Sequence, residues 1–281
     1  MNIRPRPVSG IRPQARLMKG RRLSFSIDKR QKFVVAILLL SASLFFAEYQ
    51  FNQQGIFIAF ILPFLTCISL LWAIRTDLKE NKSYQVFILP FLYSLAFGFF
   101  YFLTPTTFLV RLLLTAIYAF GLYSLFLSQN IFIVSSSRTI QLLSGARIVS
   151  FVITLISYFF LINIIFSFHA IIFPVIALIG IFTYLLIYHS LWTYTLQKFS
   201  HPLALWVSAL TVCVIEVATL VWFWPSNPTV TALFLTGFLY SIVGLSHIWL
   251  EKRLFKGILW EYVWVGTIVF FVLMLFTSWG K

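Results

Sequence analysis

Charged side chains are scarce in this sequence. Asp, Glu, Lys and Arg together make up 10% of the 281 residues, and only seven residues are acidic. Soluble domains carry about a quarter charged residues, so the composition excludes a water-soluble globular protein. The chain is instead strongly apolar, with 60% hydrophobic residues and a mean hydropathy of +0.95. This composition predicts a protein of the lipid bilayer.

Cysteine and the common catalytic motifs are also rare or missing. The two cysteines, Cys67 and Cys213, fall inside apolar runs, which argues against a disulfide framework or a zinc site. The sequence has no Walker A loop, no GxSxG nucleophile motif and no HExxH or paired-Asp metal motif. No lysine lies inside an apolar run, which excludes a retinal Schiff base. We therefore expect neither a metal nor a cofactor.

Long apolar runs occupy most of the chain. Each is about 15–23 residues long, which matches a bilayer of roughly 30 Å at a helical rise of 1.5 Å per residue. The runs are apolar on every face, without the period of two that a membrane barrel requires. The sequence therefore predicts an all-α polytopic bundle, with a tail 1–32 and a single transmembrane domain 33–281. The nine predicted spans are 33–47, 56–74, 86–103, 107–127, 148–168, 171–192, 203–224, 229–249 and 258–279.

Lys and Arg fall on one side of the predicted spans. The tail 1–32 holds ten of the 21, alternate connections hold most of the others, and the connections in between hold none. By the positive-inside rule, we expect a cytoplasmic N-terminus and an external C-terminus. The basic connections are 75–85, 128–147, 193–202 and 250–257, and those without Lys or Arg are 48–55, 104–106, 169–170 and 225–228.

The tail 1–32 is basic, contains three prolines and shows no apolar periodicity. We expect it to be disordered and to be attracted to anionic lipid headgroups. Nucleic acid is the alternative partner for a basic tail. The placement of the charges on one side of the spans favours lipid, so we expect no nucleic-acid binding. The sequence does not identify a protein partner.

The stretch 130–147, NIFIVSSSRTIQLLSGAR, interrupts the apolar runs with polar residues. Its serines at 135–137 offer N-cap oxygens for a helix that would run through Arg138 into the next span. A helix N-terminus beside an arginine can hold an anion, so Ser136, Ser137 and Arg138 are candidates for contact with a headgroup phosphate or a phosphorylated ligand. The simpler interpretation, which we favour, is a capped helix whose arginine reaches the headgroups.

With the preceding IYAFGLYSLFLSQ at 117–129, this stretch resembles a segment in an uncharacterised family of multispanning membrane proteins from candidate-phylum bacteria. That family has no assigned activity. The resemblance implies a bacterial cytoplasmic membrane and says nothing about mechanism. The similarity centres on Asn130, Ile131, Phe132, Arg138, Thr139, Ile140, Gln141 and Leu142.

Polar residues inside spans are costly and are functional candidates by default. Arg111, Asn163 and Glu216 lie in the outer halves of three predicted spans. Glu216 shares its helix face with small residues, which predicts a helix contact rather than lipid. We expect Arg111 and Glu216 to pair. The pair would either fix the helix register, which is slightly favoured, or form part of an ion or substrate site.

A second group of candidates lies near the inner boundary and consists of His189, His247, Glu251 and Glu261. His247 and Glu251 are four residues apart and flank a stripe of small residues, Gly237, Ser241 and Gly244, which we expect to pack against a neighbouring helix. Two His and two Glu at one depth could ligate a metal. Polar residues at a membrane interface need no such explanation, and a metal is the less favoured reading.

Three classes of function remain. The first is a transporter with Arg111, Asn163 and Glu216 on its pathway. The second is a membrane-embedded enzyme that acts on lipid or isoprenoid substrates through the inner His and Glu residues. The third is a structural or assembly protein of the envelope. The size and span number favour transport, although polar residues inside the spans are few for a substrate site. The sequence leaves open whether the protein is an enzyme, and that reading is less favoured than transport.

Overall fold

The computed structural model describes residues 29–51, 55–80, 83–103, 107–135, 142–196, 201–253 and 255–277. Within these ranges the chain forms nine α-helices and one 3₁₀ turn, without strands. The helices are α1 (Lys29–Phe51), α2 (Gly55–Glu80), α3 (Ile88–Leu103), α4 (Phe108–Ser135), α5 (Leu143–Ser167), α6 (Ile172–Thr195), α7 (His201–Trp222), α8 (Pro228–Leu250) and α9 (Lys256–Leu275), and the 3₁₀ turn η2 (Tyr84–Phe87) leads into α3.

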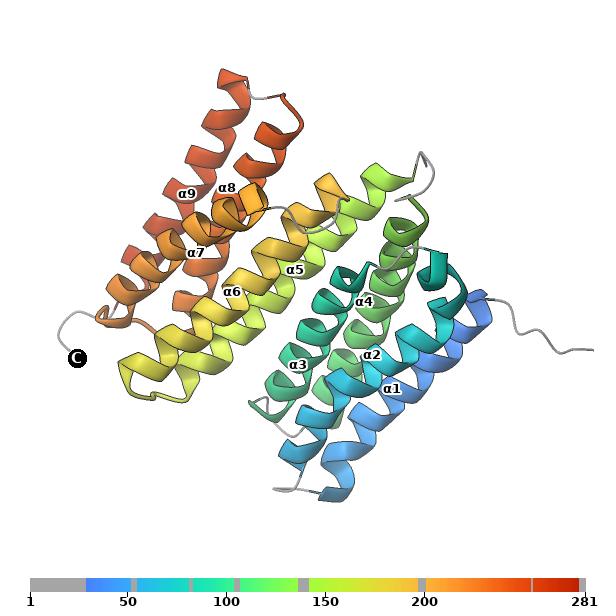
Figure 1. Cartoon of the computed structure of the whole chain (residues 1–281). Coiled ribbons are helices and arrows are strands. Elements are labelled where there is room, and N and C mark those ends of the chain that lie inside the picture. The colour runs from blue at the N-terminus through green and yellow to red at the C-terminus, as the bar shows by residue number, and fades with distance from the viewer. Residues whose placement is uncertain are drawn as a thin grey trace, which may run out of the picture.

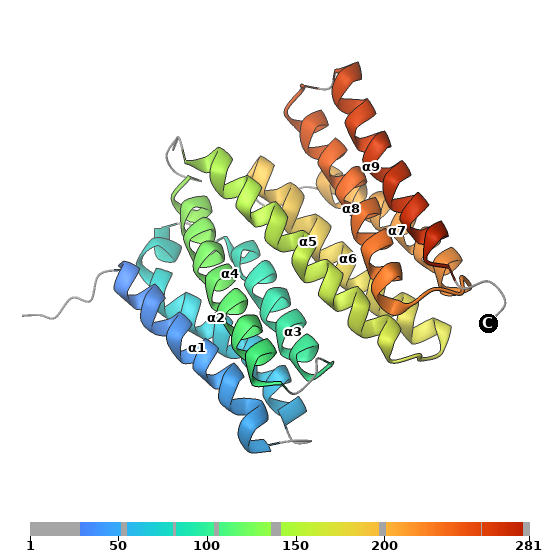
Figure 2. The ribbon, with the colours of Figure 1, turned by 180° about the vertical axis from the view of Figure 1, so that it is seen from behind.

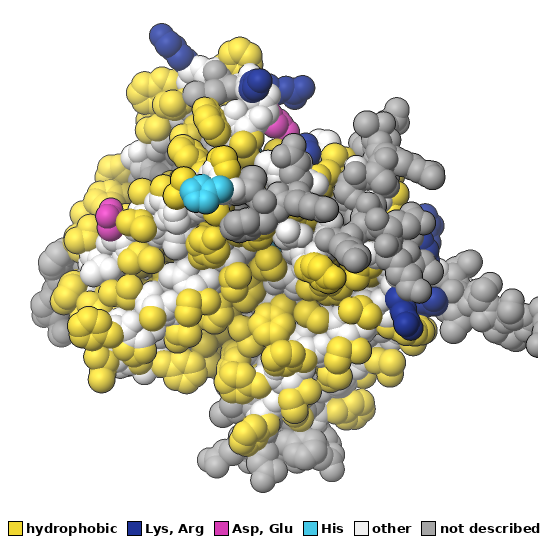
Figure 3. All heavy atoms as spheres, viewed as in Figure 1, with side chains coloured by type: hydrophobic (Ala, Val, Ile, Leu, Met, Phe, Trp, Pro, Cys, Tyr) yellow, Lys and Arg dark blue, Asp and Glu magenta, His cyan; other side chains and the backbone are white. Residues whose placement is uncertain are grey.

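Eight of the described helices, α2 to α9, are long and apolar enough to cross a membrane. The first predicted span, 33–47, lies within α1. The predicted helical bundle is therefore confirmed, and the chain has the helices of a multi-pass membrane protein. Figure 3 shows a surface dominated by hydrophobic side chains, with the visible Lys and Arg side chains along its upper and right-hand edges.

The connection between α4 and α5 differs from the prediction. Ser135 is the last residue of α4, and α5 begins at Leu143 with Leu142 in the N-cap position. The predicted serine cap of the following helix is therefore wrong. The helix α4 continues past residue 127 because Gln129, Phe132 and other side chains in this stretch are buried in the bundle. Residues 136–141, which include the headgroup candidates Ser136, Ser137 and Arg138, lie outside the described residues.

The helices form two groups that meet along one interface (Figures 1 and 2). Helices α1 to α4 pack with one another on one side, and α5 to α9 on the other. The interface between them, which we call the seam, is made by α3 and α4 against α5 and α6. Helix α5 is central because it contacts α3, α4, α6 and α8, whereas α9 packs mainly against α8.

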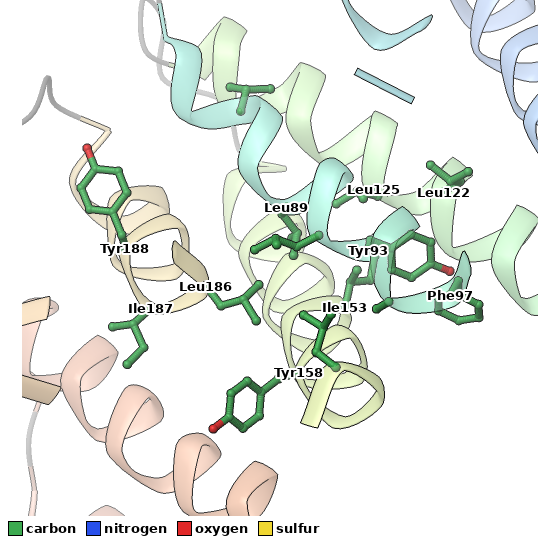
Figure 4. Packing of buried hydrophobic residues seen from close by; sticks show 14 of the residues in the cluster. Leu89, Tyr93, Phe97, Leu122, Leu125, Ile153, Tyr158, Leu186, Ile187 and Tyr188 are labelled. Atoms are coloured by element: carbon green, nitrogen blue, oxygen red, sulfur yellow. The ribbon is translucent and has the colours of Figure 1, made fainter. Parts of the chain in front are cut away.

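Large apolar side chains fill the seam and the interiors of both groups. Figure 4 shows Tyr93 and Phe97 of α3 on one side and Ile153 and Tyr158 of α5 on the other, all of them buried. Toward the C-terminal ends of α3 and α5, Phe160 of α5 contacts Phe97 and Phe100 of α3, with ring centroids 4.8 and 4.2 Å apart. Because lipid tails are as apolar as these side chains, dispersion and close packing hold such helices together.

Small residues allow the closest helix approaches. A Cβ atom at Gly237 would meet Val269 of α9, and one at Gly244 would meet Tyr262 of the same helix. Ser241, between them, donates a hydrogen bond to the Tyr262 carbonyl at 3.4 Å. The prediction that this small stripe of α8 packs against a neighbouring helix is confirmed, and the neighbour is α9.

Hydroxyl groups link the helices of the first group. The hydroxyl of Thr66 in α2 lies 2.8 Å from that of Ser94 in α3, which lies 3.0 Å from the hydroxyl of Tyr118 in α4. Tyr93 donates to the carbonyl of Tyr118 at 3.2 Å. In an apolar surrounding each of these groups needs a partner, so the network specifies how the three helices fit together.

Candidate functional site

Arg147, in the second turn of α5, reaches across to the end of α6. Its Nε donates to the Thr193 carbonyl at 3.1 Å and its Nη2 to the Tyr194 carbonyl at 3.2 Å. The guanidinium carbon lies 4.6 Å from the centre of the Tyr194 ring, a cation–π contact. Nη1 lies 3.6 Å from a carboxylate oxygen of Glu251, at the end of α8. One arginine therefore joins the ends of three helices.

The end of α6 explains why an arginine is placed there. The helix stops at Thr195, and Leu196 follows in the left-handed conformation with a φ of 48°. The last carbonyls of a helix lack intrahelical donors and carry the negative end of the helix dipole. A cation that donates to two of them satisfies both requirements, so Arg147 caps α6 from another helix.

His247 of α8 lies directly beside this arginine cluster and is buried. Its Nε2 lies 3.0 Å from the hydroxyl of Ser190. Its ring stacks on that of Tyr194, with centroids 4.1 Å apart and planes 18° apart, and meets the Phe151 ring edge-on at 4.9 Å. We call Arg147, Ser190, Tyr194, His247 and Glu251 the inner cluster. It offers a cation, a carboxylate and an imidazole at one end of the helix bundle.

His189 faces a different part of the bundle. It is fully buried, and its Nε2 lies 3.4 Å from the Oε1 of Gln129 in α4, across the seam. Two polar atoms of this pair, His189 Nδ1 and Gln129 Nε2, are buried without a hydrogen-bond partner among the described residues. Near the pair, Phe132 of α4 meets Trp192 of α6 edge-on across the seam, with centroids 6.3 Å apart. The bundle thus contains a polar pair with unused hydrogen-bonding capacity, enclosed by aromatic side chains.

The structure separates the four predicted inner-boundary residues. His247 and Glu251 belong to the inner cluster, and His189 belongs to the seam. Glu261 is exposed on α9. Among the described residues, no three His, Cys, Asp or Glu side chains come together as a metal site would require.

The predicted pair of Arg111 and Glu216 is not formed in the structure. Arg111 lies on α4 and Glu216 on α7, and the pair α5 and α6 separates these helices in both ribbon views (Figures 1 and 2). Glu216 is exposed, as are Ala209 and Cys213 on the same face. The predicted contact of this face with another helix is therefore not made within the described chain. The position of a residue within a predicted span gives its depth in the membrane. It does not give the rotation of the helix, which decides the neighbours of that residue.

Asn163 of α5 is buried and has partners. Its Nδ2 donates to the hydroxyl of Thr229 in α8 at 3.1 Å, and its own carbonyl accepts from Ser167 at 2.7 Å. Nearby, a hollow of about 400 Å³ lies at the C-terminal ends of α5 and α7 and the N-terminal ends of α6 and α8, and it is lined by the connections around His169 and Pro225. None of Arg111, Asn163 and Glu216 lines this hollow. The three residues lie on three different helices, α4, α5 and α7.

Sequence reasoning missed Arg147, Gln129, Ser190 and Tyr194. It placed Arg147 and Gln129 in a cytoplasmic connection, where polar residues are ordinary. Their position could have identified Arg147 and Gln129 as helical residues. Each lies within about two turns of a strongly apolar run, so the helix formed by that run could extend to include it. Nothing in the sequence paired Gln129 with His189, because their separation along the chain is 60 residues.

Comparison with known sequences gives the family. The sequence profile of DUF5656, described as a protein of unknown function, matches residues 34–276. No curated protein and no solved structure matches the chain. The match covers nearly all of the predicted transmembrane domain, and it includes the segment 117–147 that resembles an uncharacterised membrane family. The chain therefore belongs to the DUF5656 family.

Proposed function

We propose that this protein is a proton-linked transport protein of a bacterial cytoplasmic membrane and that the seam is its pathway. The observation that carries the proposal is the buried pair His189–Gln129. Ionisable side chains inside membrane proteins are rare and commonly serve as proton relays. Histidine is the side chain whose ordinary titration lies nearest to neutral pH, so it suits the gain and loss of a proton.

The position of the pair supports this reading. His189 and Gln129 each lie six residues from the inner end of their helix, which is about 9 Å at the helical rise. Between this depth and the outer side, the seam is filled by apolar side chains and ends in the Phe97, Phe100 and Phe160 contacts. A polar group enclosed by packed side chains on both sides is the arrangement expected of an occluded transporter, in which the two helix groups must separate to admit a solute.

The buried His189 Nδ1 and Gln129 Nε2, which lack a hydrogen-bond partner among the described residues, also support a transport function. A buried polar group without a partner costs free energy, on the order of 1–3 kcal/mol. A proton, a water molecule or a small polar solute that occupied the pair would recover part of that cost. The proposal needs no metal and no nucleotide.

Proton flux into proteoliposomes tests the proposal. The purified protein is reconstituted into vesicles that contain a trapped pH-sensitive dye. A potassium diffusion potential then drives protons inward. The flux is measured with and without an added mixture of amino acids, sugars and inorganic anions. We expect faster acidification than in protein-free vesicles and its loss in His189→Gln. The matched control is His201→Gln, because His201 is exposed at the start of α7. Equal fluxes in the wild type and His189→Gln would refute the proposal.

The inner cluster favours a second candidate, an enzyme or binding protein for lipid or isoprenoid phosphates. Arg147 can attract a phosphate, and His247 with Glu251 provides a base and an acid beside it. Against this, Arg147 already donates to two carbonyls and His247 is buried. Modification of Arg147 by a dicarbonyl reagent, measured in vesicles with and without a polyprenyl phosphate, distinguishes the two candidates. Only the second candidate function requires that the phosphate protect Arg147 from the reagent.

A further inference from the structure

Ser150 of α5 has a buried hydroxyl group that its own helix does not use. Serines inside helices can donate to a carbonyl one turn earlier, and the buried Ser128, Ser157 and Ser246 of this chain do so, each at 2.8 Å. The Ser150 Oγ is instead buried without a hydrogen-bond partner among the described residues. Its hydroxyl can therefore both donate to and accept from another group.

Two contacts set the register between α5 and α6, which run antiparallel to each other (Figure 1). Arg147 of α5 donates to the Thr193 carbonyl at 3.1 Å, and farther along α5 the Tyr158 hydroxyl accepts from that of Thr183 at 3.5 Å. Ser150 lies between these two contacts, close to the first, and therefore opposite the part of α6 around position 190. This level is within one turn of the histidine of the buried seam pair.

Neighbours on α5 show which way the Ser150 side chain faces. Phe160 faces α3, where it contacts Phe97, and Tyr158 faces α6, where it accepts from Thr183. At roughly 100° of rotation per residue, Ser150 lies about 80° from each of these two side chains and between their directions. Ser150 therefore faces the junction of α6 with the first helix group, which is the seam.

Polar side chains from three helices thus share one level of the seam. Gln129 of α4 and His189 of α6 each lie six residues before the end of their helix, and Ser150 lies seven residues after the start of α5 at the same end of the bundle. Each contributes one buried atom without a hydrogen-bond partner among the described residues, namely the Gln129 Nε2, the Ser150 Oγ and the His189 Nδ1. When polar groups face one another beyond direct bonding distance, a bridging water is the usual solution.

The contact between Gln129 and His189 determines which ring nitrogen carries the hydrogen. The Gln129 Oε1 can only accept, so the His189 Nε2, which lies 3.4 Å from it, is the N–H donor. In the neutral imidazole the Nδ1 then has a lone pair and no hydrogen. The two unpartnered atoms of the pair are therefore an acceptor on His189 and an N–H donor on Gln129.

One water molecule can satisfy all three groups. Buried waters typically make about three hydrogen bonds to polar groups that have no other partner. The Gln129 amide donates to the water oxygen, and the water donates one hydrogen to the His189 Nδ1 and the other to the Ser150 Oγ. A larger solute would need more room, because the buried rings of Phe132 and Trp192 meet edge-on one turn away.

We propose that Gln129, Ser150 and His189 hold an internal water molecule and that Ser150 positions this water for proton exchange with the His189 Nδ1. When the water is protonated to hydronium, its proton passes to Nδ1. The products are a neutral water and an imidazolium whose Nδ1–H donates to the water oxygen. The role in proton transfer rests on the proposed transport function, whereas the water site can be tested without any flux.

Solid-state NMR of the protein in bilayers tests the water site. The histidines are isotope-labelled, the His189 ring signals are identified by their loss in His189→Gln, and magnetisation is transferred from water protons to the ring nitrogens. We expect transfer to His189 although its side chain is fully buried. Ser150→Ala is expected to lower this transfer about fivefold, because the water loses one of its hydrogen bonds, and Ser150→Thr is expected to retain it.

Ser157→Ala is the matched control, because Ser157 is also buried in α5 but donates to the Ile153 carbonyl of its own helix. It should leave the transfer unchanged. Absence of transfer to His189 in the wild type would overturn the proposal, and this measurement decides the water site even if Ser150→Ala does not fold. Equal losses in Ser150→Ala and Ser157→Ala would overturn the positioning role of Ser150.

Proton flux into the dye-loaded vesicles tests the role of the water in transfer. We expect Ser150→Ala to slow the flux about fivefold, Ser150→Thr to restore it and Ser157→Ala to leave it unchanged. Wild-type flux in a Ser150→Ala protein that is folded by size-exclusion chromatography would overturn the role of Ser150 in proton exchange. Water transfer to His189 in a wild type without proton flux would support the water site and refute the transport function alone.

Discussion

The ring of His247 on α8 lies nearly parallel to that of Tyr194 on α6, with centroids 4.1 Å apart. Arg147 of α5 also contacts Tyr194, through a cation–π contact with the ring and a hydrogen bond to the backbone carbonyl. The ends of α5, α6 and α8 are thus held together by a stacked pair of rings and a cation. This arrangement predicts that the inner cluster contributes to stability whatever chemistry it carries.

Arg147→Ala should destabilise the bundle by about 2–3 kcal/mol. The substitution leaves two carbonyls at the end of α6 without a charged donor, and hydrogen bonds to charged groups contribute about 1.5–3 kcal/mol. Glu251→Gln should cost less than about 1 kcal/mol, because this ion pair is long and partly exposed to solvent. The free energy of unfolding in mixed micelles, titrated with a denaturing detergent, measures both. Equal costs for the two substitutions would show that the cap on α6 is not what Arg147 provides.

Gly121→Ala should destabilise the first helix group by about 1–3 kcal/mol, the usual cost of overpacking a core. The added Cβ atom would overlap the hydroxyl end of Tyr93. That ring cannot move aside easily, because it stacks on Tyr118 with planes 6° apart and hydrogen-bonds its backbone. Gly145→Ala is the matched control. Nothing lies within 4 Å of a Cβ atom there, so alanine should be neutral or stabilise α5 by up to roughly 1 kcal/mol.

The N-terminal tail, of which residues 1–28 lie outside the described residues, is predicted to bind anionic membranes by charge. A peptide of residues 1–32 should bind vesicles that contain anionic lipid, and the binding should weaken steeply as salt rises, because screening shortens to about 8 Å near 0.15 M. Flotation of the vesicles at several salt concentrations measures this. Binding to neutral vesicles with equal strength would contradict an electrostatic attachment.

The sequence predicts features of a single helix better than contacts between helices. The lengths of the apolar runs revealed the helices, and the spacing of Gly237, Ser241 and Gly244 revealed a packed face, since both are properties of one helix. Whether Arg111 and Glu216 meet could not be read in this way. It depends on how α7 is rotated and which helices adjoin it, and those are outcomes of packing among all the helices. For the same reason the sequence did not predict the contact between His189 of α6 and Gln129 of α4.

The contact of Asn163 with Thr229 predicts a measurable coupling between α5 and α8. Hydrogen bonds between membrane helices average about 0.6 kcal/mol in double-mutant cycles, because the unfolded chain in the membrane also finds partners. Asn163→Ala should cost more than this by itself, since the Asn163 Oδ1 also accepts from the Ser167 hydroxyl at 3.4 Å and removal of the side chain leaves a gap. The coupling with Thr229→Val isolates the interhelical part. A coupling of zero would mean that the amide finds another partner once Thr229 is removed, and that packing alone joins the outer ends of α5 and α8.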